Sequence, residues 1–234
     1  VEIVPTKLWG NWQNISLSDV KSYAHKLNGY GLQVSAFQSV LFDIPYSLLD
    51  HKNKSVLVAH FTKLCHIAEQ IDCRVLIVGS PGLRRLQMLN YKEATENAMA
   101  IFSDIGEVLN EFEIVIGLEA NPPEYGCDFL TTQAEVAEFV RALGHSQIKE
   151  HLDLGALIIN QDLNIADHLM RDLAHIHVSA PKLAPLQDRS EELKHLFHHI
   201  TGEEECWVSA EMLNLKTCQD VENHLALLSS WVGI

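Results

Sequence analysis

Short apolar runs alternate with amphipathic stretches along the whole chain. The runs are too short for helices and rich in β-branched residues, which is typical of buried strands. They predict strands at residues 2–5, 32–37, 74–78, 113–119, 148–153, 175–179 and 206–211. Between them, apolar side chains recur at three- and four-residue steps, which indicates helices packed by one face. These helices are expected at about residues 16–27, 55–71, 91–111, 131–144, 165–173, 191–200 and 217–231, with a loop at residues 6–12.

Strands that alternate with helices predict a parallel sheet with right-handed crossovers. No low-complexity linker interrupts the pattern, so residues 1–234 are expected to form one domain. Two architectures compete: an open doubly wound sheet and a (β/α)8 TIM barrel that is short of one unit. The barrel is favoured because several strands end in polar residues suited to chemistry, whereas an open sheet gathers them at one switch point.

Composition narrows the classes of partner. The chain has 234 residues, 47% of them hydrophobic, and a formal net charge of −14, which opposes binding to a nucleic-acid backbone. No apolar run is long enough to cross a membrane, and the first residues lack the layout of a signal peptide. The five cysteines are odd in number and scattered, which predicts reduced thiols and a cytoplasmic protein.

Four of the later strands end in residues that suit a divalent cation. They are Glu119, Asp153, His177 and Glu211. Three carboxylates and one imidazole match Mn²⁺, Mg²⁺ or Co²⁺, with Zn²⁺ as a further option, and leave positions open for water or substrate. Taken singly, each is more often a solvated loop residue, a helix cap or a hydrogen-bonded core histidine. Spacing alone therefore leaves a joint metal site and four unrelated residues both open.

The order of the motifs carries a resemblance to a known family. Residues 118–121 (LEAN), 152–155 (LDLG), 175–179 (HIHVS) and 208–212 (VSAEM) are similar to the strand ends of the xylose isomerase-like TIM barrels of the sugar phosphate isomerase/epimerase family. The turn at residues 79–81 (GSP), followed by two arginines, also resembles that family. The resemblance extends from Val1 to about Met212.

The resemblance implies a metal-dependent isomerase or epimerase that acts on a sugar, a sugar phosphate or a sugar-like polyol. Glu119, Asp153, His177 and Glu211 would be the metal ligands, and Glu119 and Glu211 would also be the acid/base pair. Such enzymes abstract a proton beside a carbonyl to give an enediolate, and a carboxylate then returns it.

Neighbouring residues are candidates for substrate binding. Arg84 or Arg85 could bind a phosphate or carboxylate through the planar guanidinium, although a solvated arginine at a helix start fits equally well. Trp9 could form a wall against a sugar, with ordinary packing as the alternative. Gln38 and Asn121 are expected to bind hydroxyl groups. His151 is expected to point into the barrel as a hydrogen-bonded interior residue.

Three departures from the family pattern keep other functions open. Ala156 and Ala180 stand where many members have a histidine and a glutamate. Counting back from the metal strands, the family's first strand and helix are expected to be missing before Val1. Another segment or a second subunit could close the barrel, and in the second case the chain would form a homo-oligomer. The alternatives are a catalytically silent carbohydrate-binding barrel and a dehydratase on the same scaffold. A nuclease like endonuclease IV is disfavoured, because it needs a histidine-rich zinc site and a basic groove.

Overall fold

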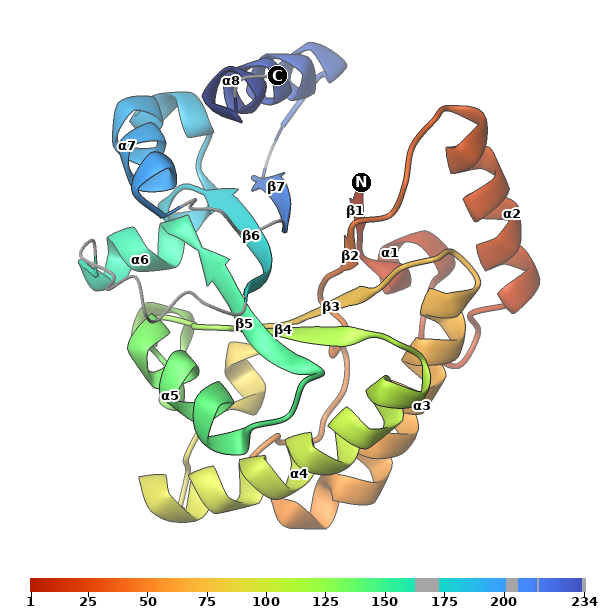
Figure 1. Cartoon of the computed structure of the whole chain (residues 1–234), viewed down its shortest axis with the longest axis vertical. Coiled ribbons are helices and arrows are strands. Elements are labelled where there is room, and N and C mark those ends of the chain that lie inside the picture. Colours follow the sequence, from red (N-terminus) through yellow and green to blue (C-terminus); the bar gives the residue numbers. More distant parts are fainter. Residues whose placement is uncertain (163–172, 201–205, 214, 233–234) are drawn as a thin grey trace.

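Seven parallel strands follow one another in chain order in the computed structural model, which describes residues 1–162, 173–200, 206–213 and 215–232 (Figure 1). The strands are β1 (Glu2–Ile3), β2 (Ala36–Phe37), β3 (Val75–Val78), β4 (Val115–Glu119), β5 (Ile148–Asp153), β6 (Leu173–Ser179) and β7 (Trp207–Glu211). Every adjacent pair is parallel, which confirms the predicted α/β barrel class. The barrel is nearly closed, but β1 and β7 are not paired with each other within the described residues. Seven strands fit the prediction that one of eight units is missing.

Helices surround the outside of the sheet (Figure 1). They are α1 (Pro5–Trp9), α2 (Leu17–Gly29), α3 (Lys54–Glu69), α4 (Tyr91–Glu111), α5 (Gln133–Leu143), α6 (Leu154–Asn160), α7 (Ser190–Ile200) and α8 (Cys218–Val232). Short 3-10 helices lie in the connections at His51–Asn53, Pro81–Leu83, Pro123–Tyr125, Pro181–Leu183 and Leu186–Arg189.

Capping residues set the starts of the two helices that flank β4. Asn90 accepts from the backbone N–H of Glu93 at the start of α4, and the Glu93 side chain accepts in return from the Asn90 backbone. Thr132 and Glu135 form the same capping box at the start of α5. These caps satisfy amide groups that a helix start otherwise leaves without partners.

Four elements differ from expectation by more than two residues. Strand β2 covers only Ala36–Phe37 of the predicted residues 32–37. Residues 5–9 form the short helix α1 instead of a loop, because Pro5 at its first position has a backbone angle already suited to a helix. Helix α6 follows β5 without a loop, and Asp153 is its N-cap. Residues 165–172 of the predicted helix 165–173 lie outside the described residues, and Leu173 begins β6.

The core has an outer and an inner part. Apolar faces of the helices pack on the outside of the strands in two large clusters, one around β1–β4 and one around β6 and β7. A small cluster lies apart from them and consists of Ala36, Val75, Ile77 and Ala174, with Val115 packed against it. The two outer clusters contain most of the buried hydrophobic side chains, and the buried polar residues include His151, His175 and His177.

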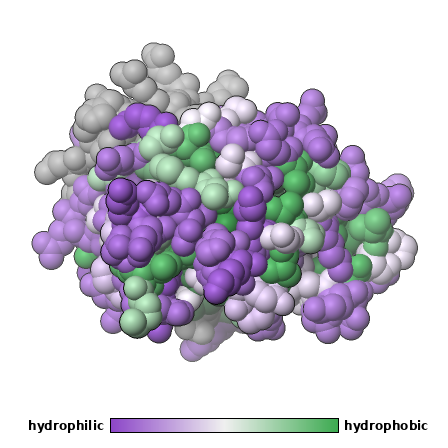
Figure 2. Space-filling model, turned by 90° about the horizontal axis from the view of Figure 1, so that it is seen from below, coloured by the Kyte–Doolittle hydropathy of each residue, from purple (hydrophilic) through white to green (hydrophobic). Residues whose placement is uncertain are grey.

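The surface, the cysteines and the length of the helices can be compared with the expectations from composition. The face at the bottom of Figure 1 is mostly hydrophilic, with hydrophobic areas interspersed (Figure 2). Cys65, Cys73, Cys127 and Cys218 are free thiols, and the first three are buried. In the part of the chain that the structure describes, no helix combines the length and apolar character needed to span a membrane.

Candidate active site

A cavity of about 550 Å³ brings together residues from the ends of β3 to β7. Its lining includes all four strand-end residues that the sequence singles out, namely Glu119, Asp153, His177 and Glu211. The rest of the lining comes from the loops that follow the strands. A cavity of this size suits a small-molecule ligand.

The His177 imidazole lies at the centre of the carboxylates. Its Nδ1 is 3.2 Å from Oε2 of Glu211, 3.8 Å from Oε1 of Glu119 and 3.9 Å from Oδ2 of Asp153. One ligand atom each of Glu119, Asp153 and His177 lies within 4.8 Å of the other two. Residues 58 positions apart in the sequence thus face one point, because parallel strands present their carboxyl ends at the same edge.

Two hydrogen bonds hold the Asp153 carboxylate. Its Oδ1 accepts from the backbone N–H of Ala156 at 2.6 Å, and its Oδ2 accepts from the Ser179 hydroxyl at 2.7 Å. The Ser179 hydroxyl in turn accepts from the backbone N–H of Gly155 at 3.0 Å. A Cβ at Gly155 would lie 2.5 Å from Ser179 Oγ, so only glycine leaves room for this arrangement.

Asn121 orients the Glu119 carboxylate, and the lack of a side chain at Gly79 leaves room for it. Asn121 donates from Nδ2 to Oε2 of Glu119 at 2.9 Å. Oε2 also lies where a side chain at Gly79 would begin, because a Cβ there would be only 2.0 Å from it. The glycine of the predicted GSP turn therefore provides space for a carboxylate that belongs to the next strand.

Glu2 is bound to His177 from the opposite side of the ring. His177 Nε2 lies 2.9 and 3.0 Å from the two carboxylate oxygens of Glu2, and the Glu2 side chain is only 7% exposed. The two residues are 175 positions apart and belong to β1 and β6.

The charges in this cluster shift one another's ionisation. Burial and the charge of Glu119 raise the pKa of Asp153 to about 7, although the Ser179 hydrogen bond opposes the shift. Burial alone would lower the pKa of His177, but Glu119, Glu2 and Glu211 outweigh it and raise that pKa well above its usual value. The cluster is thus a buried concentration of negative charge that a cation stabilises.

The same residues fit a divalent cation. The buried Nδ1 of His177 makes no hydrogen bond, and it points toward three carboxylates that would otherwise repel one another. Carboxylate oxygens with one imidazole nitrogen form a donor set for Mg²⁺, Mn²⁺, Co²⁺ or Zn²⁺. Glu119, Asp153, His177 and Glu211 are the residues that would hold the ion.

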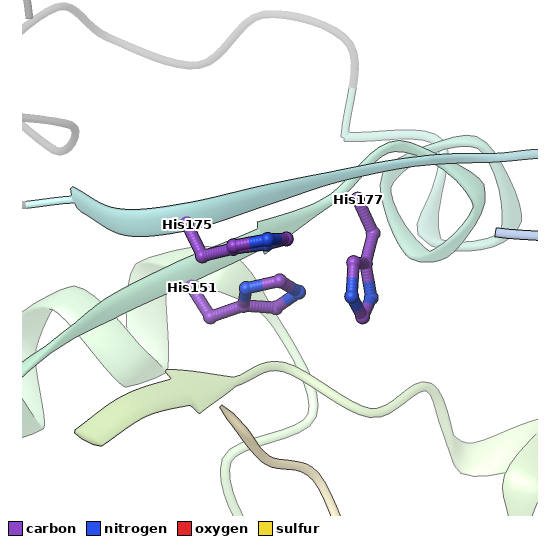
Figure 3. A group of neighbouring side chains, drawn as sticks. All are labelled: His151, His175 and His177. Carbon is purple, nitrogen blue, oxygen red and sulfur yellow. The ribbon is translucent and has the colours of Figure 1, made fainter. Parts of the chain in front are cut away.

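Two more histidines lie beside His177 (Figure 3). The rings of His151 and His175 are stacked at 5.4 Å, and the His177 ring is nearly perpendicular to both. Ring nitrogens of the three lie within 4.8 Å of one another, so they are a second arrangement that could hold a metal ion. His175 Nε2 is 3.0 Å from the Ser209 hydroxyl. His177 can join only one of the two arrangements through Nδ1, because its Nε2 is already bound to Glu2.

Burial keeps His151 and His175 neutral. Burial first, and then the neighbouring His177, lowers the pKa of His175 to about 3 and the pKa of His151 well below its usual value. His151 points into the barrel as expected, but both ring nitrogens lack a well-formed hydrogen bond within the described residues.

The predicted substrate-binding residues divide into two groups. Gln38 and Asn121 line the cavity. Arg84, Arg85 and Trp9 are not among its lining residues. Arg84 is fully buried and donates to the backbone carbonyl of Glu119 at 2.9 Å, and Arg85 donates to that of Gly126. Trp9 packs edge-on against Tyr23 and Phe37. These contacts favour structural roles for all three.

Sequence reasoning missed several residues of the site. Glu2, Ser179, Tyr125 and Lys182 touch or line it. Two of them had a signal. Glu2 is a lone acid in an apolar strand, and Ser179 follows His175 and His177 at two-residue steps, which places all three on one face. Tyr125 and Lys182 belong to short 3-10 helices in the connections, where no periodicity predicts which way a side chain points.

Fold and site together define a barrel of the xylose isomerase-like class. A family model described as xylose isomerase-like TIM barrel matches residues 1–220. The chain therefore belongs to the xylose isomerase-like TIM barrel family, as the strand-end motifs predict. A comparison of the sequence with curated proteins finds no match.

Solved structures share the fold at low sequence identity. A D-psicose 3-epimerase, solved in the presence of D-fructose, is 14% identical with a TM-score of 0.77, and the match covers 100% of this chain and 89% of that one. A family 2 AP endonuclease from Brucella melitensis is 17% identical with a TM-score of 0.74, covering 91% and 83%. A xylose isomerase-like TIM barrel protein from Mycobacterium smegmatis, in complex with magnesium, is 15% identical with a TM-score of 0.64, covering 99% and 84%.

Proposed function

We propose that the protein is a metal-dependent isomerase or epimerase of a sugar, sugar phosphate or sugar-like polyol. The observation that carries the proposal is the convergence of Glu119, Asp153 and Glu211 on His177 Nδ1 within a cavity of about 550 Å³. The fold likeness to a D-psicose 3-epimerase supports the reaction class.

Glu119, Asp153, His177 and Glu211 are proposed to hold one divalent cation. When bound, such an ion polarises a carbonyl oxygen and acidifies the adjacent C–H bond. Mg²⁺, Mn²⁺ and Co²⁺ suit the three carboxylates, and the imidazole also accommodates Zn²⁺. Asp153 is held by two hydrogen bonds, which fits a ligand that keeps one orientation through the reaction.

Glu119 and Glu211 are proposed to move the proton. One carboxylate removes it from the carbon beside the carbonyl, and the same or the opposite carboxylate returns it. Return to the opposite face of the same carbon gives an epimer, and return to the neighbouring carbon exchanges aldose and ketose. The side chains of Glu119 and Glu211 are 17% and 19% exposed, so both are reachable from the cavity yet largely shielded from water.

The loops are proposed to position the substrate. Gln38 and Asn121 offer amide groups to sugar hydroxyls, and Phe42 and Leu213 add apolar surface to the lining. Asn121 has a second role, because its hydrogen bond to Glu119 fixes the direction of the proposed base. The free thiols of Cys65, Cys73, Cys127 and Cys218 support a reducing compartment and hence the cytoplasm.

The test is a panel of ketoses, aldoses and their phosphates in D₂O, with and without chelation of metal ions. We expect at least one sugar to take up solvent deuterium, and we expect chelation to abolish uptake and added Mn²⁺ or Mg²⁺ to restore it. A protein that binds metal and sugar but exchanges no proton would contradict the proposal and support a silent carbohydrate-binding barrel. Release of water from the sugar would instead identify a dehydratase.

A further inference from the structure

We propose that Glu2 is a positioning residue of the metal centre, which holds His177 so that Nδ1 faces the three carboxylates. The inference rests on the proposed function, because it assumes that His177 is a ligand. It adds a residue from the opposite end of the chain, which the strand-end motifs do not include.

The hydrogen bond between Glu2 and His177 determines which ring nitrogen is free. An ionised carboxylate can only accept hydrogen bonds, so the nitrogen that faces Glu2 must carry a proton. Both carboxylate oxygens lie within 3.0 Å of Nε2. A histidine that coordinates a metal ion is neutral, so its lone pair is then on Nδ1, the atom that lies 3.2 Å from Glu211.

The surroundings of His177 leave Glu2 as its orienting partner. The ring is 2% exposed, and the rings of His151 and His175 meet it edge-on at 4.3 and 5.1 Å. Those contacts limit the space for the ring but do not choose between its two nitrogens. Metal-bound histidines usually donate their second N–H to a carboxylate or carbonyl, which orients the ring and makes the ligating nitrogen more basic.

The hydrogen bond between Glu2 and His177 also links two strands that are not neighbours in the sheet. Within the described residues β1 pairs only with β2, while His177 is on β6. The hydrogen bond therefore crosses the barrel interior and links an edge strand to the proposed metal centre. A purely structural link would stabilise the fold without changing metal affinity, so the two roles can be separated by experiment.

The experiment measures Mn²⁺ affinity and thermal unfolding in the wild type, E2A, E2Q and E150Q. Glu150 is a matched control, since it is a buried carboxylate on β5 that accepts from Gln133 at 2.7 Å. We expect E2A to weaken Mn²⁺ binding about 10- to 100-fold, the effect typical of removing such a partner. E2Q keeps an acceptor but loses the charge, so we expect an intermediate loss. We expect E150Q to bind as the wild type does.

A nitrogen-15 spectrum of the histidines in the Zn²⁺-bound wild type gives an independent readout. We expect His177 to coordinate through Nδ1 and to carry its proton on Nε2. Coordination through Nε2 would overturn the inference, and so would wild-type affinity in E2A and E2Q. If E2A does not fold, wild-type affinity in E2Q alone overturns it. A wild type that binds no metal would overturn the proposed function as well, and the two failures are thus distinguishable.

Discussion

The Oε2 atom of Glu119 occupies the space where a side chain at Gly79 would begin. A Cβ at residue 79 would lie 2.0 Å from Oε2, 3.3 Å from the carboxylate carbon and 3.3 Å from Oδ1 of Asn121. The absence of a side chain at the end of β3 is therefore part of how the Glu119 carboxylate reaches the cavity.

Gly79→Ala is expected to displace the Glu119 carboxylate and break its hydrogen bond to Asn121. A shift of about 1 Å in a reacting group can reduce turnover by about 100-fold, so we expect a loss of that order in deuterium exchange. Gly82→Ala is the matched control, because it lies in the same turn and a Cβ there meets nothing within 4 Å. Equal exchange rates for the two variants would contradict this assignment of Gly79.

Arg84→Ala is expected to destabilise the fold. The guanidinium is fully buried and donates to the backbone carbonyls of Glu119 and Leu130, so its removal leaves a cavity and acceptors without donors. We expect a loss of about 2–4 kcal/mol in the free energy of unfolding, measured with urea. Arg85→Ala, which removes one exposed hydrogen bond, is the control and should cost less than about 1 kcal/mol. An Arg84 variant of unchanged stability but raised KM would instead support substrate binding.

His60 is expected to make stability depend on pH. Burial lowers the pKa of this imidazole, although a hydrogen bond with the Val40 carbonyl opposes the shift. The unfolded chain gains a proton as the pH falls through about 6.5, while the folded chain gains it only at lower pH. His60 therefore reduces stability as the pH falls below about 6.5, by at most about 1.4 kcal/mol per pH unit.

The check on His60 compares urea unfolding of the wild type and H60Q at pH 7.5 and pH 5.5. Glutamine can still donate to the Val40 carbonyl but does not titrate in this range. We expect the wild type to lose more stability than H60Q between the two pH values. Parallel losses in the two proteins would show that His60 is not responsible.

Much of the fold could be predicted because hydrophobic periodicity depends on local sequence. Helix α4 and strand β5 have the predicted bounds. The short helix α1 was missed, since five residues give too little periodicity to separate a helix from a loop. Helix α6 was missed because Asp153 serves both as a strand end and as a helix cap.

Site residues could be predicted from the sequence only where they end a strand, because the strand then determines where the side chain points. Glu119, Asp153, His177 and Glu211 end parallel strands, and barrel geometry brings such ends together. Glu2 stands out in the sequence as a lone acid, but nothing in the sequence pairs it with His177, because the two residues are 175 positions apart. Arg84 follows a glycine-rich turn in the sequence, yet its side chain points into the protein, where the backbone carbonyl of Glu119 binds it.

Glu211 is proposed to move a proton on a sugar within a metal centre. The most direct measurement is deuterium exchange in E211Q, with E124Q as a control, since Glu124 is exposed and does not line the cavity. Glutamine keeps the shape of the side chain but cannot accept a proton, so we expect exchange to fall by roughly 100- to 10,000-fold, with the thermal unfolding temperature unchanged. E124Q should exchange at the wild-type rate. Full exchange by E211Q would contradict the claim.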